Sequence, residues 1–229
     1  MLIFSARSPS SGTKRSPRAL PARAGFTLIE LMVVMAIIVL VTGLLLARQS
    51  RFNSSTLLRS LSYSVALTIR QAQTYGTSVR ENAVGSASFV GIYGVWFNGG
   101  SSYTLYVDVN KNGIFDGGDV TVQTYKVGAG YSINTYCAYA LGSMSCSGSC
   151  PPSATQNKLG VGSCTPSAIN SLSIYFKRPN PDALFTTVPA GPQTWSGAYI
   201  ELISGTDTGN TRSIDISNTG EIAVDTLGS

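Results

Sequence analysis

Hydrophobic residues follow three different patterns along the 229-residue chain. The first pattern is an almost unbroken apolar run from Phe26 to Ala47, FTLIELMVVMAIIVLVTGLLLA, in which Glu30 is the sole charged residue. At a rise of about 1.5 Å per residue, a helix of this length crosses the hydrocarbon core of a bilayer. We therefore predict a membrane-spanning helix over residues 26–47.

The second pattern is amphipathic and follows directly. Apolar residues spaced three or four apart define one face of a continuing helix; these are Leu58, Leu61, Val65, Ile69 and Ala72. Gly76 is a typical helix stop. The expected element is an amphipathic continuation over residues 48–76, packed as a spine against the rest of the chain.

The third pattern begins near residue 83, where short strand-like runs are separated by Gly, Ser and Asn. The runs cover residues 89–97, 103–107, 120–127, 171–176, 199–203, 213–217 and 221–224. The turn Asn218-Thr219-Gly220 predicts that the last two form a hairpin. Six or seven strands fit one or two antiparallel sheets. The expected fold class is therefore α+β, with a long N-terminal helix packed on an antiparallel β-sheet domain at residues 83–229.

Charge is concentrated at the N-terminus. Five of the 16 Lys and Arg residues precede Phe26, which leaves 11 to balance the 11 Asp and Glu residues. A basic flank stays in the cytoplasm by the positive-inside rule, so the chain after Arg48 is expected outside it. The basic leader thus accounts for the net charge of +5.

Composition argues against an enzyme. The chain has no His, which removes His-based acid–base catalysis, the Ser-His-Asp and Cys-His triads and most catalytic zinc sites. Its carboxylates are scattered apart from one loop, and no nucleophile elbow occurs. We predict no catalytic residues.

The start of the apolar run is unusual for a signal or an anchor. A secretory signal has a shorter apolar region and a small-x-small cleavage site, and a plain anchor leaves the costly carboxylate of Glu30 unexplained. The sequence Arg23-Ala24-Gly25 followed by FTLIEL resembles the signal of type IV prepilins and type II secretion pseudopilins. The resemblance implies that prepilin peptidase removes residues 1–25 by cutting between Gly25 and Phe26, and that Phe26 is then N-methylated.

Glu30 is the predicted assembly residue. Cleavage leaves a cationic amine at Phe26, and in lipid the amine of a neighbouring subunit is a natural partner for the Glu30 carboxylate. The alternative is that Glu30 snorkels to the membrane edge. The chain departs from many pilins in having no Pro between Pro21 and Pro151, and Gly43 is the residue that could loosen the helix instead.

The segment Ile69-Arg70-Gln71-Ala72-Gln73, with Gly76 after it, resembles the helix end of GspH/FimT-like minor pilins. This resemblance implies a structural, minor subunit of a type IV pilus or a type II secretion pseudopilus. Its partners would be other pilins, and its location a single pass of the inner membrane with the C-terminal domain outside the cytoplasm. The alternative is a DNA- or surface-binding adhesive minor pilin. Nucleic acid is the weaker expectation, because the processed chain is neutral and has Lys177-Arg178 as its adjacent cations.

One loop has the spacing of a calcium site. Counted from Asp108, oxygen-bearing side chains occupy positions 1, 3, 5, 9 and 12, Gly113 is at position 6, and position 7 offers a carbonyl. The candidate ligands are Asp108, Asn110, Asn112, Ile114, Asp116 and Asp119. Asp119 replaces the longer Glu of an EF-hand, and the loop follows a strand, so no EF-hand helix pair is expected. The alternative is a solvated turn between strands.

The four cysteines lie in a region rich in Ser, Gly and Pro; they are Cys137, Cys146, Cys150 and Cys164. An even number outside the cytoplasm predicts two disulfides, with three pairings possible. The favoured pairing nests Cys146–Cys150 inside Cys137–Cys164. A zinc cluster is the competing interpretation, which the missing CxxC spacing and the missing His disfavour. The stapled loop is expected to stabilise the domain or to contact a partner.

Overall fold

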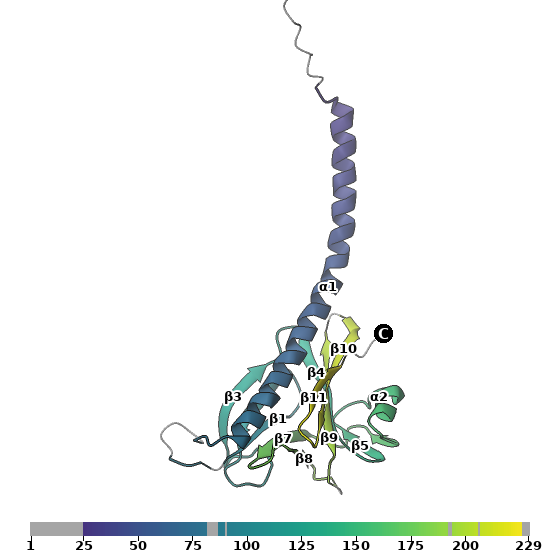
Figure 1. The fold of residues 1–229 in the computed structure, drawn as a ribbon. Helices are drawn as coiled ribbons and strands as arrows, with labels where there is room; N and C mark the ends of the chain where they lie inside the picture. Colours follow the sequence, from purple (N-terminus) through teal and green to yellow (C-terminus); the bar gives the residue numbers. More distant parts are fainter. Residues whose placement is uncertain (1–24, 82–86, 90, 192–193, 206, 226–229) are drawn as a thin grey trace, which may run out of the picture. The chain divides into compact units, whose positions relative to one another are not determined.

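The computed structural model describes residues 25–81, 87–89, 91–191, 194–205 and 207–225; the side chains of 47–53, 207 and 208 are not considered. The chain divides into two compact units between Ala47 and Arg48. Helix α1 (Leu28–Thr77) contributes its first part to one unit and its second part to the other (Figure 1). Of the expected leader, Gly25 alone lies within the described residues.

Within the described residues, the N-terminal unit is a single apolar helical segment. Its helix begins where the Thr27 hydroxyl oxygen accepts a hydrogen bond from the Glu30 backbone N–H at 3.3 Å, with Glu30 at the third helical position, as in a capping box. The stretch Leu28–Leu46 is long and apolar enough to cross a membrane, and all its side chains are exposed. A helix that is apolar on every side needs lipid or other helices around it.

The second part of α1 forms the spine of the C-terminal unit. Leu58, Val65, Ile69 and Ala72 are completely or almost completely buried. Gly76 lies in the last turn of the helix, which ends at Thr77, and a Cβ atom at Gly76 would come within 2.6 Å of the Phe176 carbonyl oxygen. The close approach of helix and strand therefore requires glycine.

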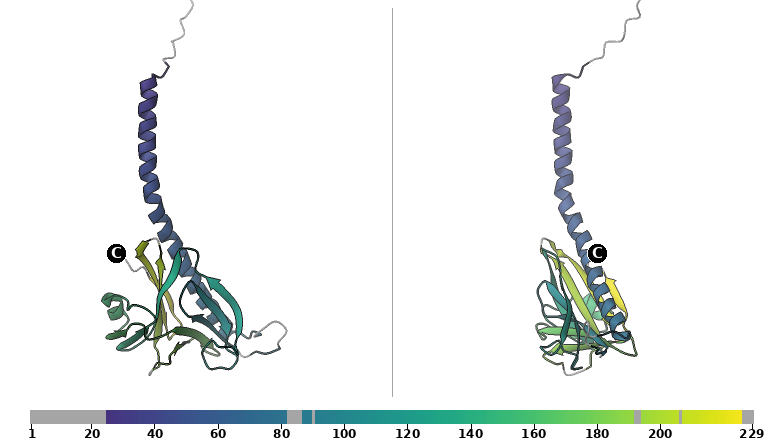
Figure 2. Two further views of the ribbon diagram at one scale, coloured as in Figure 1. Left: turned by 180° about the vertical axis from the view of Figure 1, so that it is seen from behind. Right: turned by 90° about the vertical axis from the view of Figure 1, so that its left-hand side faces the viewer.

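The β domain consists of two sheets (Figures 1 and 2). The five-stranded sheet has the order β3-β2-β1-β7-β8, with β1 (Ile92–Phe97), β2 (Ser102–Val107), β3 (Val120–Lys126), β7 (Ser171–Lys177) and β8 (Ala183–Val188). The six-stranded sheet has the order β11-β10-β9-β4-β5-β6, with β4 (Tyr131–Ala140), β5 (Ser143–Cys146), β6 (Ser163–Thr165), β9 (Gly197–Ser204), β10 (Asp207–Ser217) and β11 (Ile222–Asp225). Every neighbouring pair is antiparallel except β5 and β6, which are parallel.

The predicted α+β class is confirmed, with more strands than the sequence indicated. Strands β4, β5, β6 and β8 were not predicted. The first expected run starts at residue 89, whereas β1 starts at Ile92, because Gly91 has a φ of +74° and interrupts the extended backbone. The predicted C-terminal hairpin is present as β10 and β11, with Gly220 at a φ of +79° in the turn.

One core joins the helix to the inner faces of both sheets. On β9, for example, Ala198, Ile200 and Leu202 point into this core, while Tyr199 and Glu201 alternate to the other face and are buried as well. Burial on both faces means that each sheet also has an outer cover. The two segments that provide these covers are the acidic loop (residues 108–119) and the cysteine-containing segment (residues 147–164).

Candidate functional site

The N-terminal end of α1 presents the expected processing site. Gly25, Phe26 and Thr27 precede the helix and are exposed, so the Gly25–Phe26 bond lies in non-helical backbone. Glu30 is exposed in the first helical turn, where the free backbone N–H groups of the helix favour a negative charge. Cleavage at this bond would add the Phe26 amine four residues before the carboxylate.

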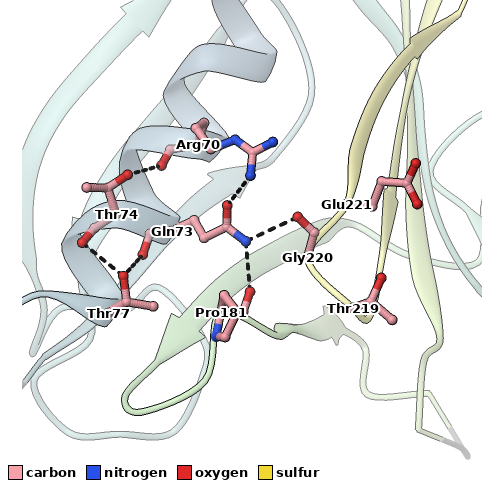
Figure 3. Close-up of a pocket in the computed structure, with 8 residues that line it drawn as sticks. All are labelled: Arg70, Gln73, Thr74, Thr77, Pro181, Thr219, Gly220 and Glu221. Atoms are coloured by element: carbon pink, nitrogen blue, oxygen red, sulfur yellow. Dashed lines mark hydrogen bonds between the residues drawn. The ribbon is translucent and has the colours of Figure 1, made fainter.

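The end of α1 is fastened to two distant loops through one side chain (Figure 3). The Gln73 amide nitrogen donates hydrogen bonds to the carbonyl oxygens of Pro181 at 2.8 Å and Gly220 at 3.1 Å. The Gln73 amide oxygen accepts a hydrogen bond from the Arg70 guanidinium at 2.7 Å. Both amide N–H bonds and the amide oxygen are thus in use. The open pocket around them, of about 510 Å³, is also lined by Glu221.

This arrangement explains the Ile69-Arg70-Gln71-Ala72-Gln73 motif. Ile69 and Ala72 are fully buried in the core, Arg70 orients Gln73, and Gln73 holds the loops. Gln71 contributes on another side, where its amide oxygen accepts a hydrogen bond from the Tyr125 hydroxyl at 3.2 Å. The motif therefore fixes the helix end to both sheets.

The acidic loop covers the outer face of the five-stranded sheet. The Phe115 ring lies 4.9 Å from the Trp96 ring and 5.1 Å from the Tyr106 ring, measured between centroids. Gly113 has a φ of +75° and lies so close to Tyr175 that a Cβ atom would approach its ring to 2.8 Å. Aromatic packing and this glycine thus hold the loop against the sheet.

The first half of the loop is folded by side-chain acceptors. The buried Asp108 carboxylate accepts hydrogen bonds from the backbone N–H groups of Lys111 at 2.6 Å and Gly113 at 2.8 Å. The Asn110 side-chain oxygen accepts from the Asn112 backbone N–H, and the Asn112 side-chain oxygen accepts from the Ile114 N–H. These successive turns bring oxygen atoms to one short stretch of loop.

The second half of the loop folds back on the first. One oxygen of the Asp116 carboxylate accepts hydrogen bonds from the side-chain amides of Asn110 at 3.0 Å and Asn112 at 2.7 Å. The Asp119 carboxylate accepts from the backbone N–H groups of Val109 and Asp116. Within the described part of the chain, however, the three carboxylates of the loop do not meet as a compact cluster.

Two carboxylates of the loop have pKa values shifted in opposite directions. Burial raises the pKa of Asp108, against the opposing effect of the hydrogen bonds from Gly113 and Lys111. Hydrogen bonds from the Gly118 N–H and from the two asparagine amides lower the pKa of Asp116. A cation held by the loop would favour the charged form of Asp108, which burial disfavours.

The cysteines form two disulfides, and the nested pairing predicted from the sequence is wrong. The bonds join Cys137 to Cys146 and Cys150 to Cys164. Cys137 and Cys146 lie directly opposite each other on the antiparallel strands β4 and β5, with their Cα atoms 4.1 Å apart. A bond from Cys137 to Cys164 would have to reach across β5 to β6, beyond the span of a disulfide.

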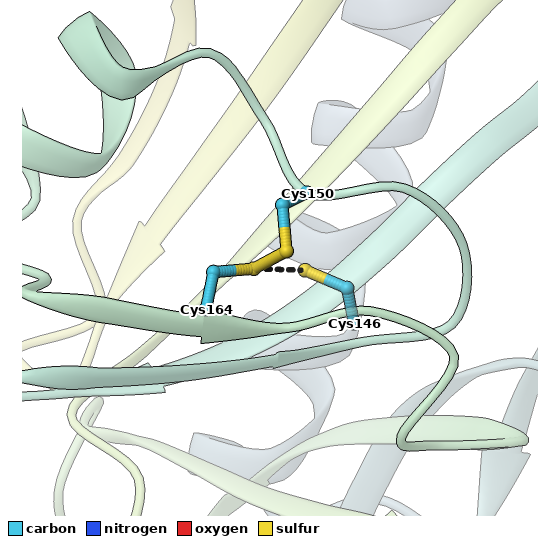
Figure 4. Close-up of side chains that lie close together, drawn as sticks. All are labelled: Cys146, Cys150 and Cys164. Atoms are coloured by element: carbon cyan, nitrogen blue, oxygen red, sulfur yellow. Dashed lines mark hydrogen bonds between the residues drawn. A yellow bond between two sulfur atoms is a disulfide. The ribbon is translucent and has the colours of Figure 1, made fainter.

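The zinc interpretation is not favoured by these bonds. The sulfur atoms of Cys146, Cys150 and Cys164 lie within 4.8 Å of one another (Figure 4). All four cysteines are disulfide-bonded, so no thiolate is left to bind a metal. The cysteine-containing segment instead packs Val161 and Leu159 against the outer face of the six-stranded sheet.

Sequence reasoning missed a group of charges at the edge of this cover. Lys158, at the end of helix α2 (Ser153–Lys158), forms an ion pair with Asp225 of β11. Nearby, burial raises the pKa of Asp215 to about 6, with the Lys158 charge opposing the shift. Among the described residues, one buried carboxylate oxygen of Asp215 has no hydrogen-bond partner. Among the cations noted in the sequence, Arg178 donates a hydrogen bond to the Phe89 carbonyl oxygen at 2.9 Å and so holds a loop.

One comparison with known proteins agrees with the interpretation of the N-terminal segment. Residues 20–46 match the model of the prokaryotic N-terminal methylation motif. The N-terminal segment is thus like that of type IV prepilins and pseudopilins, and Gly25, Phe26 and Glu30 lie inside the matched residues. Among solved structures the chain is similar to the type IV minor pilin FimU of Pseudomonas aeruginosa strain PAO1, at 13% sequence identity and a TM-score of 0.39, over 76% of this chain and 92% of that one. No curated protein matches the chain significantly.

Proposed function

We propose that this protein is a minor structural subunit of a type IV pilus or of a type II secretion pseudopilus. The observation that carries the proposal is the segment 26–46. It lies within the match to the methylation motif, and from Leu28 on it forms an apolar helix with all of its side chains exposed and a single acid in its first turn. Such a helix is stable in a membrane and equally in a bundle of similar helices. The role is structural rather than catalytic.

The proposed sequence of events has three steps. The apolar helix inserts in the inner membrane with the basic leader in the cytoplasm. Prepilin peptidase then cuts the exposed bond between Gly25 and Phe26, and Phe26 is methylated. Finally the helix leaves the lipid and packs among the helices of other pilins, while the β domain stays outside the cytoplasm.

Glu30 supplies the register of assembly in this proposal. It is the sole charged residue between Phe26 and Ala47, and a carboxylate in an apolar helix bundle needs a cationic partner. The amine of Phe26 on a neighbouring processed subunit is such a partner. Because the pair forms at one axial offset between two helices, it selects that offset over others.

The test is incorporation of variant subunits into filaments sheared from cells. Glu30→Leu is expected to be processed and to remain in the membrane but to be lost from the filaments. Met35→Leu, which exchanges one exposed apolar residue of the same helix for another, is expected to be incorporated like the parent. Incorporation of Glu30→Leu at the parental level would contradict the assigned role of Glu30. Absence of the parental protein from every filament fraction would contradict the structural role itself.

We further propose that the acidic loop at residues 108–119 binds a calcium ion. The spacing of its oxygen-bearing side chains and the backbone turns at Asp108, Asn110 and Asn112 support this proposal. Binding would require the carboxylates of Asp116 and Asp119 to exchange their present amide and N–H partners for the ion. The effect would be to stiffen a loop that is already anchored to the sheet by Phe115.

A further inference from the structure

The two disulfides are in direct contact with each other. The Cys146 sulfur lies 3.6 Å from the Cys164 sulfur, although each is bonded to another cysteine (Figure 4). Neither of these sulfur atoms carries a proton, so the contact is not a hydrogen bond. The contact places the Cys137–Cys146 disulfide beside the Cys164 sulfur, which could attack it once released as a thiolate.

Strand pairing keeps these two sulfur atoms together. Strand β5 is antiparallel to β4, where Cys146 faces Cys137, and parallel to β6, where Met144 faces Cys164. Cys146 is two residues beyond Met144, so it is the diagonal neighbour of Cys164 on the same face of the sheet. Cys146 therefore has one cysteine on each side, and it can bond to either while β5 stays in place.

Burial decides which disulfide a reductant reaches first. Cys137 and Cys146 are fully buried, whereas Cys150 and Cys164 are partly exposed. Exchange begins with attack by an external thiolate on an accessible sulfur. The outer disulfide, Cys150–Cys164, is the accessible one.

We propose that these cysteines form a thiol–disulfide exchange centre in which Cys146 changes partner from Cys137 to Cys164. An external dithiol attacks the Cys150 sulfur, forms a mixed disulfide there and releases Cys164 as a thiolate. The Cys164 thiolate attacks the Cys146 sulfur; the Cys146–Cys164 bond forms, the Cys137–Cys146 bond breaks, and Cys137 leaves with the electron pair and takes up a proton. The second thiol of the dithiol then resolves the mixed disulfide, which leaves Cys150 as a thiol and the dithiol oxidised.

The net change is a two-electron reduction that moves the staple from β4–β5 to β5–β6. The segment that carries α2 then loses its covalent tether at Cys150 and keeps the ion pair between Lys158 and Asp225. The outer cover of the six-stranded sheet can thus be released, and closed again by oxidation, while the main core stays folded. A dithiol oxidoreductase outside the cytoplasm is the class of partner that would drive the change in either direction.

A matched pair of single variants tests the exchange without any reductant. In Cys150→Ser the full chain, purified in detergent micelles, keeps Cys164 as a free thiol beside the inner disulfide. After incubation at pH 8, acid quenching and alkylation, peptide mass mapping is expected to find label on Cys137 as well as on Cys164, and a peptide linked through Cys146 and Cys164. In Cys164→Ser the contacting sulfur is absent, and the label is expected on Cys150 with the Cys137–Cys146 bond retained. Absence of Cys137 label in Cys150→Ser would overturn the proposal.

Limited reduction of the unsubstituted chain provides a test that does not depend on how the variants fold. Molecules that retain one disulfide are expected to carry alkyl label on Cys137 and Cys150. Label on Cys150 and Cys164 alone, or on Cys137 and Cys146 as a pair, would contradict the exchange. Because the thiolate is the attacking species, incubation at pH 5 in place of pH 8 is expected to slow the appearance of Cys137 label.

Discussion

Replacing Gln73 with Ala is expected to destabilise the C-terminal unit by about 2 kcal/mol. The substitution removes hydrogen bonds to the carbonyl oxygens of Pro181 and Gly220, and an intramolecular hydrogen bond contributes about 1 kcal/mol net. Gly220 is buried, so its carbonyl oxygen would also lose its partner away from water. Arg70 loses an acceptor as well, but its guanidinium remains at the open pocket and can be hydrated.

Two further variants separate this effect from a loss of side-chain bulk. Gln73→Glu keeps an acceptor for Arg70 but cannot donate to either carbonyl oxygen, so it is expected to be at least as destabilising as Gln73→Ala. Gln71→Ala removes a residue of the same type two positions away, whose partners are the hydroxyl groups of Tyr75 and Tyr125. Water can replace this residue at both hydroxyl groups, so the expected loss is below about 1 kcal/mol.

The assay is urea unfolding of the full chain in detergent micelles, followed by near-ultraviolet circular dichroism of the aromatic core. With an m-value of about 2 kcal/mol/M, Gln73→Ala is expected to lower the midpoint by about 1 M. The midpoint of Gln71→Ala should move by less than half of this. Equal midpoints for Gln73→Ala and the parent would refute the role of Gln73 as the link between the helix and the two loops.

Three other predictions concern the covers of the two sheets. Calcium is expected to raise the unfolding free energy of the parent, by about 2.7 kcal/mol at a concentration 100 times Kd. Asp108→Asn should abolish this rise, whereas Asp182→Asn, at an exposed position, should retain it. An identical unfolding midpoint of the parent in calcium and in chelator would contradict the site. The folded-state pKa of Asp215 is raised to about 6 from 3.8, so the folded protein binds this proton more tightly than the unfolded chain does. The resulting contribution to the unfolding free energy is complete below pH 3.8 and is lost as the pH rises through 6. Asp215→Asn is therefore expected to be more stable than the parent at pH 7.5, by up to about 3 kcal/mol, and to lose this advantage near pH 4 in parallel unfolding curves. Phe115→Ala is expected to cost about 2 kcal/mol and to shift the emission of Trp96 to the red; unchanged emission would contradict the packing of the loop on the sheet.

The sequence predicted the helix well because its periodicity reflects real burial. Leu58, Val65, Ile69 and Ala72 contact the core on one face, while the other face of the helix is polar enough to leave a 3.6-residue pattern. Strand β4 gives no such pattern. Thr135 and Cys137 point away from the core yet are buried beneath the cysteine-containing segment, so the alternation of polar and apolar residues is lost.

Candidate sites could be suggested from the sequence where their residues are close together in the chain. The proposed cleavage motif and the proposed calcium loop each consist of neighbouring residues, so their spacing in the sequence was enough to suggest them as candidates. Gln73, in contrast, acts on backbone carbonyl groups 108 and 147 residues away, which no spacing can reveal. The disulfide pairing was predicted wrongly for a related reason, because it depends on the register between β4 and β5, two strands that the sequence did not indicate.

The most direct test of the proposed function is the N-terminus of the protein recovered from membranes. Intact mass and N-terminal sequence would be compared between cells that contain a prepilin peptidase and otherwise identical cells that lack it. The proposal predicts a chain that starts at N-methylated Phe26 in the first cells and retains its leader in the second. A chain that begins at Met1 in both would contradict the proposal and reduce the apolar helix to a simple membrane anchor.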